Sequence, residues 1–209
     1  MAVDSLFEQL KHPNPRMRQR ALVEIVETRD ENTIPRLMSA IGEEDVVYRR
    51  ASVKTLGAIG MDSVPAVVEQ MLNHENDTVR ASCTKAMAQI AAFYPDEPFP
   101  QEGLDGLRKA MEDPYPVVQI AAVMSLGEVG VPAVDTLLDA LKTTDNVAIA
   151  LTITNTLGSI GDPRALEVLR DLIADESVDS YVRETAESAL SRLETLMSQR
   201  AAKGSLRNS

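Results

Sequence analysis

Apolar side chains recur along this chain at helical spacing inside a longer repeat of just over 30 residues. Six apolar anchor positions are separated by 31, 31, 39, 31 and 33 residues, and a second apolar residue follows each anchor eight positions later. The six pairs are Met17/Ile25, Tyr48/Leu56, Val79/Met87, Val118/Leu126, Ile149/Leu157 and Val182/Leu190. A repeat of this length with helical spacing inside it predicts a stack of helical hairpins.

Each repeat also contains a first helix, which is indicated by apolar residues at i, i+3 and i+7, such as Val64, Val67 and Met71. In five of the six repeats, an Asn or Asp lies three residues before the anchor and can cap the second helix. These residues are Asn14, Asp45, Asn76, Asn146 and Asp179. The sequence therefore predicts an all-α fold, an α-solenoid of about six helical hairpins.

The domain organisation follows from the same repeat. Because the repeat is unbroken, we expect a single solenoid over residues 1–198. The one spacing of 39 residues indicates an insert near residues 92–103, where three prolines block helix continuation. The period is lost from Met197 onward, so residues 199–209 are expected to form a flexible tail.

Composition narrows the classes of function. The chain has 209 residues and a formal net charge of −11, which argues against nucleic-acid binding because that needs a basic stripe. No apolar run approaches the roughly 20 residues that span a bilayer, and no signal-peptide pattern is visible. A single cysteine fits a reducing compartment. We therefore expect a cytoplasmic protein without a membrane span.

Recognisable catalytic and metal-binding patterns are missing. His12 and His74 have no His or Cys at ligand spacing, so we expect no metal site. Cys83 falls on a small, buried row of its second helix, which favours a structural role over a reactive thiol. Because no nucleophile and base come together in the repeat, the catalytic residues stay unknown and no cofactor is predicted.

The outward face of the second helices, which lines the concave side of a solenoid, changes character along the chain. Cations occupy it in the second and third repeats, and apolar residues occupy it in the fourth and fifth. The cations are Arg50, Lys54 and Lys85, and the apolar residues are Ile120, Met124 and Leu151. An apolar outward face is normally covered, so it indicates either a partner interface or self-burial in a tightly curled solenoid.

Two further groups of residues have alternative interpretations. The insert contains the aromatic residues Phe93, Tyr94 and Phe99. Either Phe93 and Phe99 plug the seam between repeats, or the insert is a docking loop that presents Tyr94 and Phe99 to a partner. An arginine also follows the anchor directly in four repeats, at Arg18, Arg49, Arg80 and Arg183. We expect this row to pair with carboxylates of the neighbouring repeats.

Three segments resemble the HEAT-like repeats of cyanobacterial phycobilin lyases. They are residues 42–60, which contain Tyr48-Arg49-Arg50 and end in Leu-Gly-Ala-Ile-Gly, residues 12–21, which open with His-Pro-Asn-Pro, and residues 161–165, Gly-Asp-Pro-Arg-Ala. In length and in its early Tyr-Arg-Arg, the chain is similar to the smaller, F-type subunits of the heterodimeric phycocyanobilin lyase for the phycocyanin α subunit. The resemblance covers nearly the whole chain.

The resemblance implies a lyase subunit that is active only with a larger, E-type partner. The heterodimer is expected to bind phycocyanobilin as its substrate ligand and to attach it by a thioether to a cysteine of the phycocyanin α subunit. Arg50, Lys54 or Lys85 would then pair with the bilin propionates. Tyr48 and Asp45 would orient the bilin or shuttle protons, although Tyr48 is also a repeat anchor. Catalysis would rest on positioning of the reactants.

Two other functions fit the same repeat. The Leu-Gly-x-Ile-Gly and Asp-Pro-Arg-Ala pieces are also similar to phycobilisome-degradation factors, which suggests a non-enzymatic adaptor that binds phycobiliproteins or bilin during phycobilisome turnover. A general HEAT-like scaffold would bind protein alone and leave bilin spectra unchanged. Formation of a thioether between bilin and protein distinguishes a lyase from both of these functions.

Overall fold

The computed structural model describes residues 2–207. The chain divides into two compact units, one that ends at Ser125 and one that begins at Leu126, and the boundary falls inside α8 (Pro116–Val129). Between residues 2 and 207 there are twelve α-helices and two short 3-10 helices, and no β-strand. The predicted all-α fold is confirmed, whereas one uninterrupted domain over 1–198 stays a prediction.

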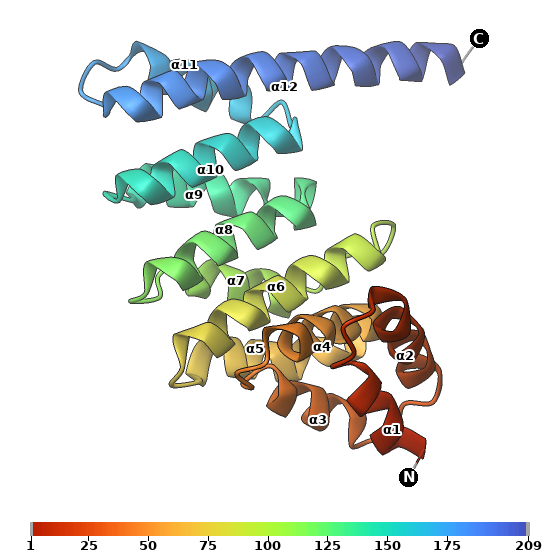
Figure 1. Cartoon of the computed structure of the whole chain (residues 1–209). Helices are drawn as coiled ribbons and strands as arrows, with labels where there is room; N and C mark the ends of the chain where they lie inside the picture. Colours follow the sequence, from red (N-terminus) through yellow and green to blue (C-terminus); the bar gives the residue numbers. More distant parts are fainter. Residues whose placement is uncertain (1, 208–209) are drawn as a thin grey trace. The chain divides into compact units, whose positions relative to one another are not determined.

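The first unit follows the predicted repeat (Figure 1). Its elements before α8 are α1 (Ala2–Gln9), α2 (Pro15–Glu27), α3 (Thr33–Ala40), α4 (Val46–Ile59), η1 (Gly60–Ser63), α5 (Val64–Asn73), α6 (Asp77–Phe93) and α7 (Gln101–Ala110). Helices α1, α3 and α5 each pack against the helix that follows, and the second helices α2, α4 and α6 pack in series. The first helices α3, α5 and α7 are also neighbours, which is the pairwise stacking of an α-solenoid.

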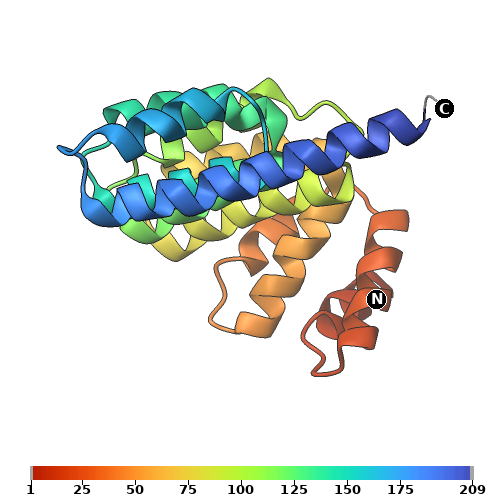
Figure 2. The same ribbon diagram turned by 90° about the horizontal axis from the view of Figure 1, so that it is seen from above.

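The second unit repeats this arrangement. After α8 it contains η2 (Val131–Ala133), α9 (Val134–Thr143), α10 (Val147–Ile160), α11 (Ala165–Ala174) and α12 (Ser180–Arg207). The pairs α9/α10 and α11/α12 are hairpins, and α10 packs along α12. Figure 2 shows that α12 extends well past α11 toward the C-terminus.

The second helices begin where the sequence predicts. Four of the predicted caps accept hydrogen bonds from backbone N–H groups of the first turn, and these are Asn14, Asp45, Asn76 and Asn146. Asp179 accepts a bond of 2.9 Å from the Tyr181 N–H. In the fourth repeat, where Tyr115 stands at the cap position, the carboxylate of Asp113 accepts from the Tyr115 N–H instead.

The repeat anchors and the apolar residues eight positions later form the core of each unit. Leu56 and Met87 in the first unit and Leu157 in the second are fully buried. Met17 and Leu190 are only partly buried, because they belong to the first and last repeats, which each have a single neighbour.

The C-terminal residues differ from the predicted flexible tail. Helix α12 continues to Arg207, and the Arg200 guanidinium donates to the carbonyls of Gly161 and Ile160 at 2.8 and 3.0 Å. These bonds tie α12 to the end of α10. Residues 208–209, the last of the predicted tail, lie outside the described residues. No described helix is both long and apolar enough to cross a membrane.

Candidate functional site

Helices α4 and α6 border a groove of about 450 Å³ on their outward faces. The anchors Tyr48 and Val79 are buried, and of the residues two and six positions later Arg50, Lys54 and Lys85 are exposed while Ala81 is buried. The groove is lined by Arg50, Lys54 and Lys85 together with the apolar Val46, Val53 and Val117. The structure therefore brings the three predicted cations into one site.

The groove is positive although the chain is acidic. Neither Asp nor Glu is found among the described residues that line it. Arg50 and Lys85 are exposed and make no ion pair or hydrogen bond with another described side chain, whereas Lys54 Nζ donates to Gln19 Oε1 at 2.9 Å. Unpaired cations beside apolar side chains are suited to an organic anion.

A smaller cavity of about 260 Å³ lies on the other side of α4, against α2. Its lining includes Pro15, Arg18, Gln19, Leu22 and Val47. Val46, Arg50 and Lys54 line both cavities, so the i, i+4, i+8 face of α4 forms a ridge between them. Sequence reasoning missed this cavity, although Gln19 occupies the same outward repeat position as Arg50.

Tyr48 and Asp45 lie outside the groove. Tyr48 is only 8% exposed, with Lys11 Nζ 4.8 Å from its ring centroid, and burial raises the pKa of its hydroxyl while the charge of Lys11 opposes that rise. The Asp45 carboxylate accepts from the N–H groups of Val47 and Tyr48 at 2.8 and 3.2 Å. Tyr48 therefore packs in the core and Asp45 caps α4, and a direct role for either residue in binding a bilin stays a prediction.

The predicted pairing of the arginine row is wrong for Arg18 and Arg49. Their guanidinium groups donate to backbone carbonyls five or six residues earlier, in the turn before their own helix. Gln119 does the same toward the Asp113 carbonyl at 2.7 Å. The carbonyls at the end of a helix lack intrahelical partners, so the row stabilises hairpin turns. Arg183 differs, since its Nε is buried without a described partner.

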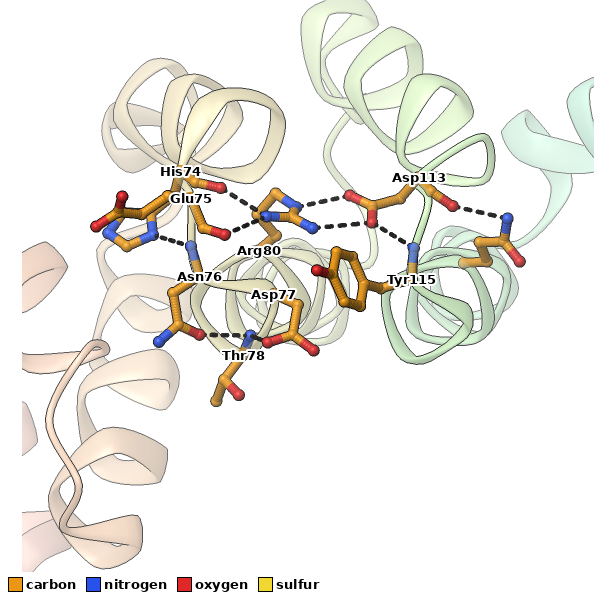
Figure 3. A network of polar contacts seen from close by, with 9 residues as sticks. His74, Glu75, Asn76, Asp77, Thr78, Arg80, Asp113 and Tyr115 are labelled. Atoms are coloured by element: carbon orange, nitrogen blue, oxygen red, sulfur yellow. Dashed lines mark hydrogen bonds and ion pairs between the residues drawn. The ribbon is translucent and has the colours of Figure 1, made fainter.

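Arg80 alone in this row matches the prediction, and it forms the network in Figure 3. Its Nε and Nη2 donate to the Asp113 carboxylate at 2.7 and 3.0 Å, and its Nη1 donates to the carbonyls of His74 and Glu75. Both side chains of the ion pair are 8% exposed. Burial raises the pKa of Asp113, but the hydrogen bonds from Arg80 and from the Tyr115 N–H outweigh it, so that the pKa is lowered.

The aromatic residues of the insert match neither interpretation completely. The Tyr94 hydroxyl donates to the Ala58 carbonyl at 2.7 Å, and its ring covers Gly60 so closely that any side chain there would collide with it. The Phe99 ring lies against Gly103 in the same way. Phe93, by contrast, is 40% exposed. Tyr94 and Phe99 therefore pack against the fold while both stay partly exposed, and the predicted burial of Phe93 is wrong.

The apolar outward residues are not fully covered within their own units. Met124 in α8 is 61% exposed, while Ile120 in α8 and Leu151 in α10 are partly exposed. Self-burial is therefore incomplete at Met124. A partner interface at these residues stays a prediction.

No reacting group of the chain itself is evident beside the groove. Cys83 is fully buried, and burial raises the pKa of its thiol to about 12, so the thiol is neutral at ordinary pH and unsuited to be a nucleophile. The described residues contain no cluster of three or more side chains that could hold a metal ion.

Comparison with known proteins defines the family. A family model for HEAT repeats matches residues 3–88 and 104–191. The uncharacterized phycocyanin operon protein Z of Pseudanabaena tenuis (strain PCC 7409) is 52% identical over 93% of this chain and 96% of its own length. The bilin biosynthesis protein CpeZ of Synechococcus sp. (strain WH8020) is 28% identical over 84% of this chain and 97% of its own length.

A solved structure has a similar fold. It is the complex of CpcE and CpcF of phycocyanin lyase from Nostoc sp. PCC7120, which matches with a TM-score of 0.50 and 19% identity over 74% of this chain and 97% of the matched chain. The chain belongs to the HEAT-repeat proteins and, within them, to the HEAT-like phycobilin lyase family that the sequence resembles.

Proposed function

We propose that this chain is a subunit of a bilin lyase and that the groove between α4 and α6 holds the bilin. One observation carries the proposal: Arg50, Lys54 and Lys85 lie in one groove without a lining carboxylate, beside apolar surface. A linear tetrapyrrole combines an apolar conjugated body with two propionates, which is the chemistry that such a groove accommodates. The names of the relatives, which mention bilin biosynthesis and a phycocyanin operon, support the same assignment.

The reaction that we propose needs no nucleophile from this chain. A thiolate of the acceptor protein adds to the exocyclic double bond of the bilin, a carbon–sulfur bond forms, and the proton lost by the thiol ends on the neighbouring ring carbon. Nothing is oxidised or reduced. Holding the bilin in one orientation lowers the entropic part of the barrier, which agrees with a buried, neutral Cys83. The chain's contribution is binding and orientation.

We further propose the particular reaction and partner. The bilin is phycocyanobilin, the acceptor is a cysteine of the phycocyanin α subunit, and the active form is a heterodimer with a larger, E-type HEAT subunit. The similarity in fold to a structure of two lyase proteins in complex supports a two-subunit enzyme. The exposed Met124 and Phe93 are candidate contacts for that partner.

Covalent pigment attachment tests the proposal. Cells that make phycocyanobilin, the apo-α subunit and the E-type partner are compared with and without this chain, and zinc-induced fluorescence of the α band is read after denaturing electrophoresis. We expect fluorescence that depends on this chain. Pigment attachment that is independent of it would contradict the lyase function and favour a non-enzymatic adaptor for phycobiliproteins or bilin.

A matched pair of variants tests the groove. Arg50→Gln combined with Lys85→Gln is expected to reduce the fluorescence of the α band severalfold, because the bilin loses two of the three cations of its groove. Lys142→Gln combined with Arg170→Gln removes the same charge from exposed positions of the second unit and is expected to leave attachment unchanged. Equal loss in both variants would contradict a specific role of the groove.

A further inference from the structure

The two cavities beside α4 have a common arrangement of charge. The ridge between them carries Arg50 and Lys54, which line both cavities. Away from the ridge, the smaller cavity is lined by the apolar Pro15, Leu22 and Val47 together with Arg18 and Gln19. The larger one is lined by Val53, Ala81 and Val117 together with Arg49, Thr78, Ser82, Lys85 and Gln89. Because backbone carbonyls hold the guanidinium groups of Arg18 and Arg49, the cations open to a ligand are Arg50 and Lys54 on the ridge and Lys85 in the larger cavity, with apolar residues on both sides of the ridge.

A linear tetrapyrrole has the complementary arrangement. Its two propionates are attached to the two central rings, and its outer rings are uncharged. We propose that the two cavities form a single two-lobed site in which the pigment lies across α4, with its carboxylates on the ridge and one half of its ring system in each lobe. This inference rests on the proposed function and adds to it the α2/α4 lobe as a binding subsite.

Arg50 and Lys54 on the ridge each bind one propionate of the pigment in this arrangement. Arg50 and Lys54 are one helical turn apart, about 6 Å along the axis, so each can hold one of two neighbouring carboxylates. The planar guanidinium of Arg50 suits bidentate binding of a carboxylate. Gln19 acts on the pigment through Lys54, because its side-chain oxygen accepts a hydrogen bond of 2.9 Å from Nζ and orients the ammonium group. It is therefore a positioning residue.

Size favours two lobes over one. Sites for small organic ligands usually have volumes of about 300–1,000 Å³. The smaller cavity, at about 260 Å³, falls below that range and suits part of a ligand, whereas the larger one, at about 450 Å³, lies near its lower end. Lys85, which lines the larger cavity only, is placed to donate to the lactam oxygen of an outer ring.

Absorption and induced circular dichroism titrations of the full-length chain test the two-lobed site. The probes are biliverdin, a tetrapyrrole with two propionates, its dimethyl ester, and xanthobilirubic acid, a two-ring compound with one carboxylate. Val47→Phe fills the smaller lobe, and Gln19→Glu adds a carboxylate next to Lys54. Each is expected to weaken biliverdin binding about tenfold, equivalent to about 1.4 kcal/mol. Val47→Phe is expected to leave xanthobilirubic acid binding unchanged, because the larger lobe can hold half a pigment.

Matched controls separate the lobe from general effects. Val147→Phe adds the same ring at a similarly exposed valine of α10, and Gln101→Glu adds the same charge at the start of α7; neither is expected to change biliverdin binding. Weaker binding of the dimethyl ester supports carboxylates on the ridge.

Two results would overturn the two-lobed site. One is biliverdin affinity that survives both Val47→Phe and Gln19→Glu while Arg50→Gln lowers it, since the pigment would then occupy the larger lobe alone. The other is the absence of saturable biliverdin binding to the unmodified chain. Neither result bears on whether covalent attachment in cells depends on this chain, so the lyase proposal and the subsite fail separately.

Discussion

The outward faces of α4–α6 and α10–α12 occupy the same positions of the repeat but differ in chemistry. In the first unit these positions present Arg50, Lys54 and Lys85 around a groove. In the second unit α10 presents the uncharged Leu151 and Asn155 at these positions, and α12 presents Glu184 and Ser188. A cation that lies nearby already has hydrogen-bond partners, because Arg192 donates to the Asn155 side chain at 3.2 Å and to the Ser159 hydroxyl at 3.5 Å.

The frame beneath the two faces is the same. Leu56 in α4 and Leu157 in α10 are fully buried, and each is followed by a glycine that allows close helix packing. A Cβ at Gly57 would collide with the Gln89 Cβ, and one at Gly158 would lie 2.7 Å from the Ala189 Cβ. The repeat therefore sets the fold, and exposed positions that do not affect it carry the difference in surface chemistry.

The largest expected effect concerns a contrast between two Arg–Asp contacts. Asp113→Ala in the first unit leaves Arg80 buried without its carboxylate, and we expect a loss of about 3–5 kcal/mol in the free energy of unfolding. Asp135→Ala removes an exposed partner of Arg164 in the second unit and is expected to cost at most about 1 kcal/mol. Urea unfolding followed by circular dichroism measures both, and equal losses would contradict the difference in burial.

The same ion pair makes stability depend on pH. The pKa of Asp113 is lowered in the folded chain, so its contribution is present above the ordinary aspartate pKa near 3.8 and is lost as the pH falls through the lowered value. Acid titration of the native chain and of Asp113→Asn should therefore differ, with a shallower loss of stability below about pH 4 in the variant. If stability fell with pH in the same way in both proteins, the pKa of Asp113 would not differ between the folded and the unfolded chain.

The shared frame predicts equal costs in the two units. Leu56→Ala and Leu157→Ala each leave a cavity at a fully buried site, and we expect each to lower the free energy of unfolding by about 2–5 kcal/mol. Exposed Val23→Ala on α2 is the control and should change it little. If only one leucine replacement were destabilising, the two units would not share one packing frame.

A smaller effect is expected at the close helix contacts. Gly57→Ala forces apart α4 and α6, and Gly158→Ala does the same to α10 and α12, each at a cost of about 1–3 kcal/mol. Because Gln89 also lines the groove, Gly57→Ala should in addition alter binding of biliverdin, whereas Gly158→Ala should not. Comparison of the two variants therefore distinguishes a loss of helix packing, which both share, from a change at the groove, which only Gly57→Ala causes.

The repeat allowed much of the fold and part of the site to be predicted from sequence. Helix caps such as Asp45 and buried anchors such as Leu56 follow from local spacing, and the same register placed Arg50, Lys54 and Lys85 on one face. Periodicity determines which face of a helix a residue occupies, so it could bring these cations together without knowledge of the loops.

The features that sequence reasoning missed depend on contacts that periodicity does not encode. Arg18 and Arg49 donate to carbonyls of the turns before their own helices, and Arg200 joins α12 to the end of α10. Each of these contacts depends on the path of a loop in three dimensions. The aromatic residues of the insert were also unpredictable from periodicity. Tyr94 is held by a hydrogen bond from its hydroxyl to the Ala58 carbonyl, 36 residues away in the sequence. Phe93 is an aromatic residue of the same insert, yet it is exposed.

The smallest expected effect has opposite signs in the two units. Arg50 and Lys54 are like charges at i and i+4, so Arg50→Gln should raise the free energy of unfolding by about 0.2–0.5 kcal/mol at low salt. Arg192→Gln removes satisfied hydrogen bonds from the α10–α12 face and should lower it by about 0.5 kcal/mol. Paired urea titrations at 20 °C in dilute buffer and in 1 M NaCl measure both, and salt should abolish the gain from Arg50→Gln because it screens the repulsion between the two cations. If the chain becomes more stable when Arg50 is replaced, Arg50 does not serve the fold, which favours a role in binding. Loss of stability in Arg50→Gln would instead mean that Arg50 supports the fold, as Arg80 does.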